Sequence, residues 1–116
     1  MMSEFKAGYT QLAANMTLLN KHCPDVMKDF AALHTDAVHT KNVSTKNKEL
    51  IALGIAIALH CEGCILSHVR SLVNAGATMT EIAEAVEVAI LMGGGPATVY
   101  GGKALAVAEA LFAEKT

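Results

Sequence analysis

A chain of 116 residues, 53% hydrophobic but only 4% aromatic, is long enough for one domain. Nine basic and eleven acidic residues give a formal charge of −2, too weak a field to attract nucleic acid or a membrane. The longest apolar run, Leu50 to Leu59, is too short to cross a bilayer core of about 30 Å. We therefore expect a single domain, residues 1–116, with no nucleic-acid or membrane partner and with some aliphatic surface buried between subunits.

The N-terminal segment MMSEFKAGYTQ has no charged start, apolar middle or small-residue cleavage site of the kind that marks a secretory signal, which predicts a cytoplasmic protein. In a reducing compartment, a close pair among three cysteines is more typical of catalysis or metal binding than of a structural disulfide. Cys23 has no partner nearby in the sequence, so we expect it to be a buried apolar thiol.

Two helices are predicted before the polar loop HTKNVST. The first begins with Ser3 as its cap and runs to about residue 21, and the second spans about residues 25 to 39, after Pro24. Apolar residues recur in each at the three-to-four spacing of one helix face, so these side chains are expected to point inward. They are Phe5, Tyr9, Leu12, Met16 and Leu19 in the first helix, and Val26, Phe30, Leu33 and Val38 in the second.

The third and fourth predicted helices meet at the cysteine pair. Ser44 or Thr45 can cap a helix that is apolar nearly all round, which makes it the expected central element. A break at His60 and Cys61 precedes a helix over residues 62 to 74, with Ala75 and Gly76 as its stop. Both Cys61 and Cys64 should therefore lie near a helix start.

The C-terminal part predicts two more helices. Thr78 and Glu81 have the spacing of a capping box for a helix that runs to Met92, where the segment GGGP ends it. The last helix, about residues 97 to 113, is rich in Ala and Gly, which suits close packing or a subunit contact. Since no alternating strand pattern is present, the fold class predicted is all-α, a compact bundle of about six helices that assembles into oligomers.

The candidate chemistry lies in the segment HCEGCILSH. On a helix, Cys61, Cys64 and His68 fall within roughly 60° of arc, so two thiols and an imidazole share one face. A helix start and a nearby imidazole both lower the pKa of a thiol, which favours the reactive thiolate. Glu49, twelve residues before Cys61, can orient His68 or accept its proton, or it can be a solvated first-turn residue.

Other chemistries fit less well. A structural zinc site uses four ligands, and this chain offers one cluster of three. Covalent haem attachment requires His directly after the second cysteine, where Ile65 stands, and GGGP lacks the lysine of a phosphate-binding loop. We therefore expect neither a metal nor a cofactor. The remaining histidines are interpreted as a helix-junction residue, His60, and as exposed residues, His22, His34 and His39.

The order of Glu49, Cys61-Glu-Gly-Cys64 and His68, followed by the segment NAGAT and Glu81-Ile82, resembles a known family. It is similar to the alkyl hydroperoxide reductase D-like (AhpD-like) branch of the carboxymuconolactone decarboxylase family. The likeness covers about residues 47 to 105, roughly half of the chain. The resemblance implies an all-helical fold, homotrimers or homohexamers, and a site that cycles through a disulfide.

In such proteins a glutamate and a histidine form a proton relay that activates the second cysteine. This implies that Glu49 and His68 activate Cys64, with Cys61 as its disulfide partner. The expected activity is that of a thiol-dependent peroxidase with an antioxidant role. Its expected partners are a hydroperoxide or disulfide substrate and a dithiol electron donor, such as a lipoyl group or a small redox protein. A peroxiredoxin is a further expected partner.

The sequence departs from the peroxidase pattern at Gly63, where those members carry a histidine. One alternative is therefore a disulfide reductase or an adaptor for a peroxiredoxin. A second is a non-catalytic helical oligomer whose thiols hold metal. A third is a lactone decarboxylase, but members with that activity lack the cysteine pair.

Overall fold

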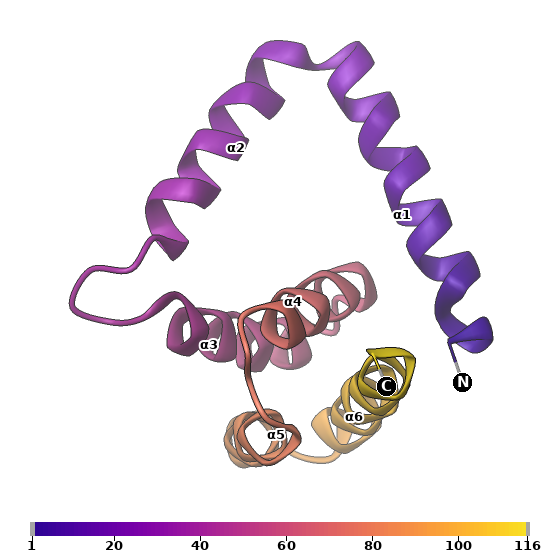
Figure 1. Ribbon diagram of the computed structural model, residues 1–116, viewed down its shortest axis with the longest axis vertical. Helices are drawn as coiled ribbons and strands as arrows, with labels where there is room; N and C mark the ends of the chain where they lie inside the picture. Colours follow the sequence, from indigo (N-terminus) through magenta and orange to yellow (C-terminus); the bar gives the residue numbers. More distant parts are fainter. Residues whose placement is uncertain (1, 116) are drawn as a thin grey trace.

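The computed structural model describes residues 2–115, and all the regular structure in this range is helical (Figure 1). The all-α fold class is therefore confirmed. The helices follow the predicted order closely: α1 (Ser3–His22), α2 (Pro24–Val38), α3 (Thr45–Ala58), α4 (Glu62–Asn74), α5 (Met79–Gly93) and α6 (Gly95–Lys115). No helix within residues 2–115 is both long and apolar enough to cross a membrane.

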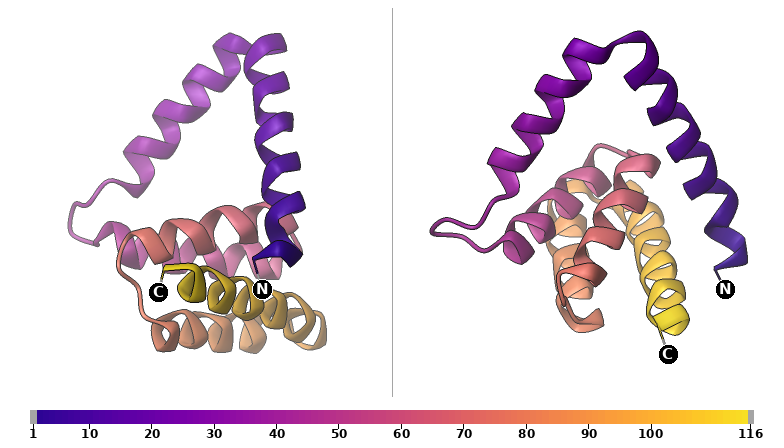
Figure 2. Two further views of the ribbon diagram at one scale, coloured as in Figure 1. Left: turned by 45° about the vertical axis from the view of Figure 1, so that its right-hand side comes forward. Right: turned by 45° about the horizontal axis from the view of Figure 1, so that its top comes forward.

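Helices α3 to α6 form a body around one hydrophobic core (Figures 1 and 2). Gly101 shows how closely α6 approaches α5, since a β-carbon at this position would lie 2.7 Å from Val86 Cγ1. Only glycine allows this approach without a shift of the valine, as expected for a helix rich in small residues. The largest fully buried side chains all belong to the body: Leu53, Ile57, Ile65, Val69, Leu72, Ile82 and Val107.

Three of the predicted helix ends are confirmed, and one is wrong. The Ser44 hydroxyl caps α3 by accepting a hydrogen bond from the amide of Asn47, and Thr78 and Glu81 form a reciprocal capping box on α5. Gly76 ends α4 with a φ of 84°, a conformation that glycine adopts at no steric cost. Ser3, however, lies inside α1 and caps nothing, because the helix begins one residue earlier than its hydroxyl would require.

Helices α1 and α2 form an arm that rises from the body as an open hairpin (Figures 1 and 2). The stripe of α1 begins on the body, where Tyr9 is buried, but Met16 and Leu19 further along it are each 39% exposed. No residue of α2 is buried, and Val26, Phe30 and Leu33 are all exposed, although they were predicted to face inward. That prediction is wrong because helical spacing identifies a common face but does not supply a second element to cover it.

Two further expectations need correction. Cys23 is exposed rather than buried, because it lies at the junction of α1 and α2, where the body does not reach it. Helix α3 is not enclosed on all sides: it buries Leu53 and Ile57, but Ile51 and Ile55 on another face are more than half exposed. Its apolar surface is therefore wider than the core that it covers.

Tyr9 attaches the arm to the body. Its hydroxyl donates a hydrogen bond to the carbonyl of Leu66 at 2.7 Å, and the Arg70 guanidinium lies 3.6 Å from the centre of its ring. Burial raises the pKa of the Tyr9 hydroxyl, while the positive charge of Arg70 opposes this shift. The neutral phenol is therefore the form that this contact between α1 and α4 favours.

Candidate active site at the start of helix α4

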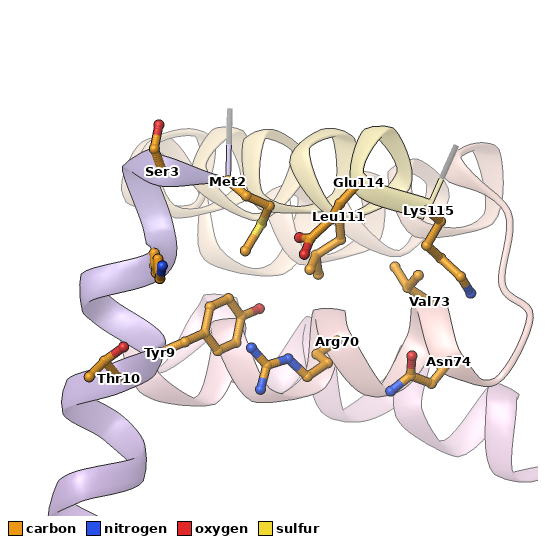
Figure 3. Close-up of a pocket in the computed structure, with 11 residues that line it drawn as sticks. Met2, Ser3, Tyr9, Thr10, Arg70, Val73, Asn74, Leu111, Glu114 and Lys115 are labelled. Carbon is orange, nitrogen blue, oxygen red and sulfur yellow. The ribbon is translucent and has the colours of Figure 1, made fainter.

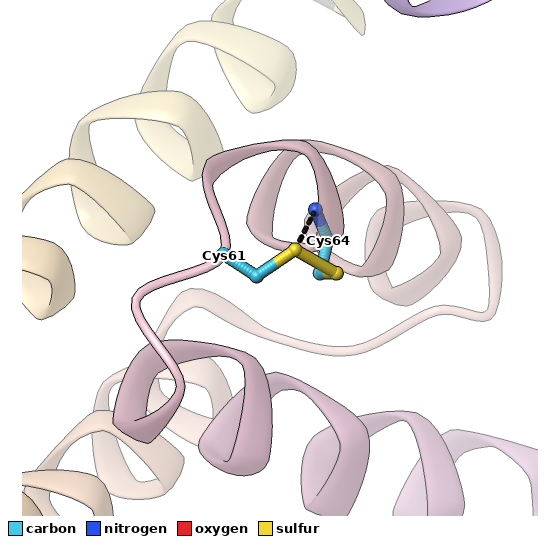
Figure 4. The surroundings of a disulfide bond; sticks show 2 residues. All are labelled: Cys61 and Cys64. Atoms are coloured by element: carbon cyan, nitrogen blue, oxygen red, sulfur yellow. Dashed lines mark hydrogen bonds between the residues drawn. A yellow bond between two sulfur atoms is a disulfide. The ribbon is translucent and has the colours of Figure 1, made fainter.

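The cysteine pair lies where the chain turns from α3 into α4. His60 adopts a φ of 58°, which is uncommon outside glycine and asparagine, and the Cys61 amide donates to the carbonyl of Ala56 at 3.0 Å. Cys61 is the N-cap residue of α4, and its Sγ accepts a hydrogen bond from the amide of Cys64 at 3.2 Å (Figure 4). A disulfide sulfur thus occupies the place usually taken by a serine or aspartate oxygen.

Cys61 and Cys64 are joined by a disulfide, with their Cα atoms 5.2 Å apart (Figure 4). Both residues are only partly buried, so their sulfurs lie close to the surface at the first turn of the helix. The free amides and the dipole of a helix start stabilise a negative charge there. This placement therefore favours a thiolate when the disulfide is opened.

Glu49 and His68 form a second pair, which links α3 to α4. His68 Nδ1 lies 2.6 Å from Glu49 Oε2, and Glu49 is only 2% exposed. A carboxylate at Glu49 only accepts hydrogen bonds, so this contact suits a His68 tautomer that donates from Nδ1 and leaves Nε2 free. The His68 side chain is 22% exposed, and the residue follows Cys64 by one helical turn on the same face.

The burial of Glu49 differs from the solvated first-turn position that spacing alone favours for a glutamate at a helix start. A buried carboxylate is costly without a partner, and here the imidazole supplies one. The structure thus brings the four candidate residues onto two adjoining helices: Cys61, Cys64 and His68 on α4, with Glu49 reaching His68 from α3.

Helix α6 contacts the turn that carries the cysteines, which the sequence did not reveal. The His60 ring stacks on Tyr100, with centroids 4.7 Å apart and planes inclined by 2°. One turn along α6, Lys103 Nζ lies 2.7 Å from Glu62 Oε1. His60 was predicted to be a junction residue, and it is one. Its partner is forty positions away, so no local pattern announces the stack.

Gly63 faces α1. A β-carbon at this position would lie 3.4 Å from Leu12 Cδ1, an ordinary contact with no room to spare. A larger side chain directed along that bond would meet the leucine. Leu12 of the arm therefore lies against the start of α4 at Gly63.

A separate polar cleft of about 910 Å³ lies between α1, α4 and α6 (Figure 3). Figure 3 shows Arg70 beside Tyr9, with Leu111 and Glu114 of α6 across the opening. Its described lining includes none of the four candidate residues. Among residues 2–115, moreover, no group of three or more His, Cys, Asp and Glu side chains is placed to hold a metal ion.

The fold and site define an all-helical protein with a Cys-X-X-Cys disulfide at a helix start, beside a histidine held by a buried glutamate. The chain belongs to the carboxymuconolactone decarboxylase family, whose model matches residues 24–110. This match extends beyond the segment from which the resemblance was inferred and includes all of α2. The family includes enzymes.

Solved structures agree with this assignment. A carboxymuconolactone decarboxylase family protein from Legionella pneumophila superposes with a TM-score of 0.88 at 34% identity, covering 91% of this chain and 95% of that one. Another, from Thermotoga maritima, gives a TM-score of 0.72 at 29% identity over 77% of this chain and 92% of its own. The Thermotoga protein is regarded as a candidate participant in an antioxidative response.

Relatives are also found among curated sequences. A protein from Cupriavidus necator is 32% identical over 113 residues, which cover 97% of this chain and all of the relative. A protein of the cox locus of Paracoccus denitrificans is 39% identical over 78 residues, 67% of this chain and 70% of its own. Both relatives are uncharacterized proteins, so the likeness suggests no activity.

Proposed function

We propose that this protein is a thiol-dependent oxidoreductase of the peroxidase type, with an antioxidant role. One observation carries the proposal: a disulfide pair lies at a helix start on the same helix face as an imidazole that a buried carboxylate orients. The helix start favours a thiolate, and the imidazole can move a proton. An enzyme that cycles through a disulfide needs both properties. The candidate antioxidative role of the Thermotoga protein supports the same direction.

The proposed cycle begins with the reduced pair. The Cys64 thiolate attacks one oxygen of a hydroperoxide, the O–O bond breaks, and the leaving alkoxide takes a proton to become an alcohol. The sulfenic acid formed on Cys64 is then attacked by Cys61, which releases water and forms the disulfide. Two electrons have passed from the thiols to the peroxide. A dithiol donor, such as a lipoyl group or a redox protein, returns them by disulfide exchange.

His68 and Glu49 manage the protons in this cycle. Glu49 accepts the Nδ1 proton of His68 in a hydrogen bond and so fixes the ring with Nε2 as its base. Nε2 takes the proton of the Cys64 thiol and later gives it to the leaving oxygen. We expect no bound cofactor or metal to take part, and we place the reaction in the cytoplasm, where dithiol donors are kept reduced.

The test follows peroxide consumption by the reduced protein with an organic hydroperoxide and dithiothreitol as the donor. Cys64→Ser should abolish consumption, because no thiolate remains to attack the peroxide. In a single turnover without dithiothreitol, Cys61→Ser should consume one equivalent of peroxide and keep a sulfenic acid on Cys64, whereas the wild type should consume one equivalent and form the disulfide. Cys23→Ser is the matched control, since this exposed cysteine lies at the far end of the arm, and it should turn over like the wild type. Equal consumption by Cys64→Ser and the wild type would contradict the proposal.

The alternative is a dithiol reductase or adaptor that passes electrons to a disulfide partner such as a peroxiredoxin. Gly63 favours it, because the histidine expected there in peroxidase members is absent and Leu12 lies against the position. Turnover with lipoamide or a protein disulfide, together with no peroxide consumption by the wild type, would select this alternative. The expected assembly into homotrimers or homohexamers is a separate prediction.

A further inference from the structure

The cleft between the arm and the body is separate from the redox site and has a chemistry of its own. Its volume is about 910 Å³, and it opens between the start of α1, the second half of α4 and the end of α6 (Figure 3). Pockets that bind small organic molecules have volumes of roughly 300 to 1,000 Å³. The cleft therefore has room for such a ligand, and its side chains indicate which kind.

Basic side chains outnumber acidic ones in this cleft. Among the lining residues that the structure describes, Lys6, Arg70 and Lys115 carry positive charge, and Glu114 supplies the one carboxylate. The whole chain, in contrast, has a formal charge of −2. A local excess of positive charge in a hollow of the surface attracts anions.

These positive charges are not neutralised within the described part of the chain. The ion pairs among residues 2–115 all lie outside the cleft, and none involves Lys6, Arg70 or Lys115. Ser3 brings the first turn of α1 to the cleft, and no side chain caps this helix start. The free amides of a helix start add partial positive charge to that of the side chains. An anionic ligand would supply the counter-charge that these groups lack.

Arg70 is the residue best prepared to bind the anion. Its guanidinium lies 3.6 Å from the centre of the Tyr9 ring, and the Tyr9 hydroxyl donates to the carbonyl of Leu66. Stacking occupies a face of the guanidinium and leaves N–H donors at its edge, where two of them match the two oxygens of a carboxylate. Because the ring restricts the guanidinium, Arg70 loses little conformational freedom when it binds a ligand.

Apolar side chains line the cleft beside these charges. They are Met2, Val73 and Leu111, and Figure 3 shows Leu111 across the opening from Arg70. A hydrocarbon group that packs on them is removed from water, which an inorganic anion cannot achieve. We propose that the cleft binds a small organic carboxylate, whose carboxylate group pairs with Arg70 and whose hydrocarbon part packs on Val73 and Leu111.

Glu114 distinguishes this ligand from a zwitterion. Figure 3 shows Glu114 across the opening from Arg70, where its negative charge repels an anion but attracts the ammonium group of an amino acid. Glu114→Gln should therefore tighten the binding of a simple carboxylate about two- to threefold. Weaker binding by this variant would overturn the proposal in favour of a zwitterionic ligand.

The first test titrates sodium octanoate into the protein by isothermal titration calorimetry. Octanoate should bind more tightly than acetate or inorganic phosphate, which lack its chain, and more tightly than 1-octanol, which lacks its charge. Arg70→Gln should weaken octanoate binding by about 10-fold or more, because the charged donors are lost. Lys28→Gln removes a positive charge from α2, which does not line the cleft, and is the matched control with unchanged affinity. Circular dichroism checks that each variant retains its helices.

The second test uses the wild-type protein and locates the ligand by nuclear magnetic resonance. Octanoate should shift the amide signals of Arg70 and Leu111, and it should leave those of Ile55 and Val88, which line an apolar groove between α3 and α5, in place. Shifts confined to that groove would overturn the proposal. So would equal affinities for octanoate and acetate, or no binding of millimolar octanoate by the wild type. Neither readout depends on peroxide consumption, so the result is independent of the proposed redox function.

Discussion

The body, α3 to α6, and the arm, α1 and α2, have similar apolar spacing but very different burial. In the body, Leu53 and Ile57, four residues apart on α3, are fully buried because the helices of the body pack around one core. In the arm, Val26 and Phe30 have the same spacing and stand exposed. Periodicity therefore identifies which residues share a face, whereas burial depends on a second element that the periodicity does not describe.

The largest contrast between body and arm should appear in a pair of histidines. His68→Asn removes the base that Glu49 orients, so the second-order rate of the reduced protein with an organic hydroperoxide should fall by about 100-fold or more. His34→Asn changes an exposed histidine of the arm and should leave the rate unaltered. Stopped-flow measurement of thiol loss compares the two. Similar rates for both variants would mean that His68 has no part in the reaction.

A pair of leucines compares the stability of the two regions. Leu53→Ala leaves a cavity in the core of the body and should lower the free energy of unfolding by about 3 kcal/mol. Leu18→Ala shortens a side chain that is 54% exposed on the arm, so the free energy of unfolding should change by less than about 0.5 kcal/mol. Urea denaturation monitored by circular dichroism measures both. Equal losses would show that the arm is as tightly packed in solution as the body.

Tyr9 tests the contact between the two regions. Tyr9→Phe removes the hydrogen bond to Leu66 and should cost about 1 kcal/mol of stability. Burial raises the pKa of Tyr9 in the folded protein above its ordinary value of 10.0. The stabilisation that the neutral phenol provides is therefore complete below pH 10.0 and is lost as the pH rises through the pKa of the folded protein. Urea titrations above pH 10 should therefore show a smaller alkaline loss of stability for the variant than for the wild type.

The smallest effect concerns an ion pair within the body. A hydrogen bond from Lys46 and another from the Thr78 amide lower the pKa of Glu81. The stabilisation by the charged carboxylate is therefore present above pH 4.5, the ordinary pKa of a glutamate, and is lost as the pH falls through the lowered pKa of the folded protein. Glu81→Gln should lose less thermal stability than the wild type on acidification below pH 4.5, as followed by the melting temperature. Parallel melting curves for the two proteins would assign no role to the carboxylate charge.

The sequence was informative wherever the physical cause is local. The capping box of Thr78 and Glu81 and the hydroxyl cap of Ser44 depend on atoms three residues apart, and both were predicted. The position of Cys61 at the start of α4 followed from the break at His60 in the same way. Such features are encoded within one turn of helix, so the sequence alone determines them.

Contacts between distant segments could not be obtained in this way. Spacing favoured a solvated Glu49, and only the family resemblance placed it beside His68, because its burial depends on how α3 packs against α4. The stack of His60 on Tyr100 was missed for the same reason. Cys23 was expected to be buried from its residue type, but the open shape of the arm leaves it exposed.

Because the Cys61 sulfur caps α4, the first turn of this helix responds to the oxidation state of the cysteine pair. The amide proton of Cys64 points at an atom that is half of a disulfide in one state and a thiol or thiolate in the other. The amide proton and nitrogen resonances of Cys64 should therefore shift when the disulfide is reduced, since a thiolate accepts a stronger hydrogen bond than a disulfide sulfur. A single backbone signal in a nuclear magnetic resonance spectrum would thus report how much of the protein is oxidised in real time.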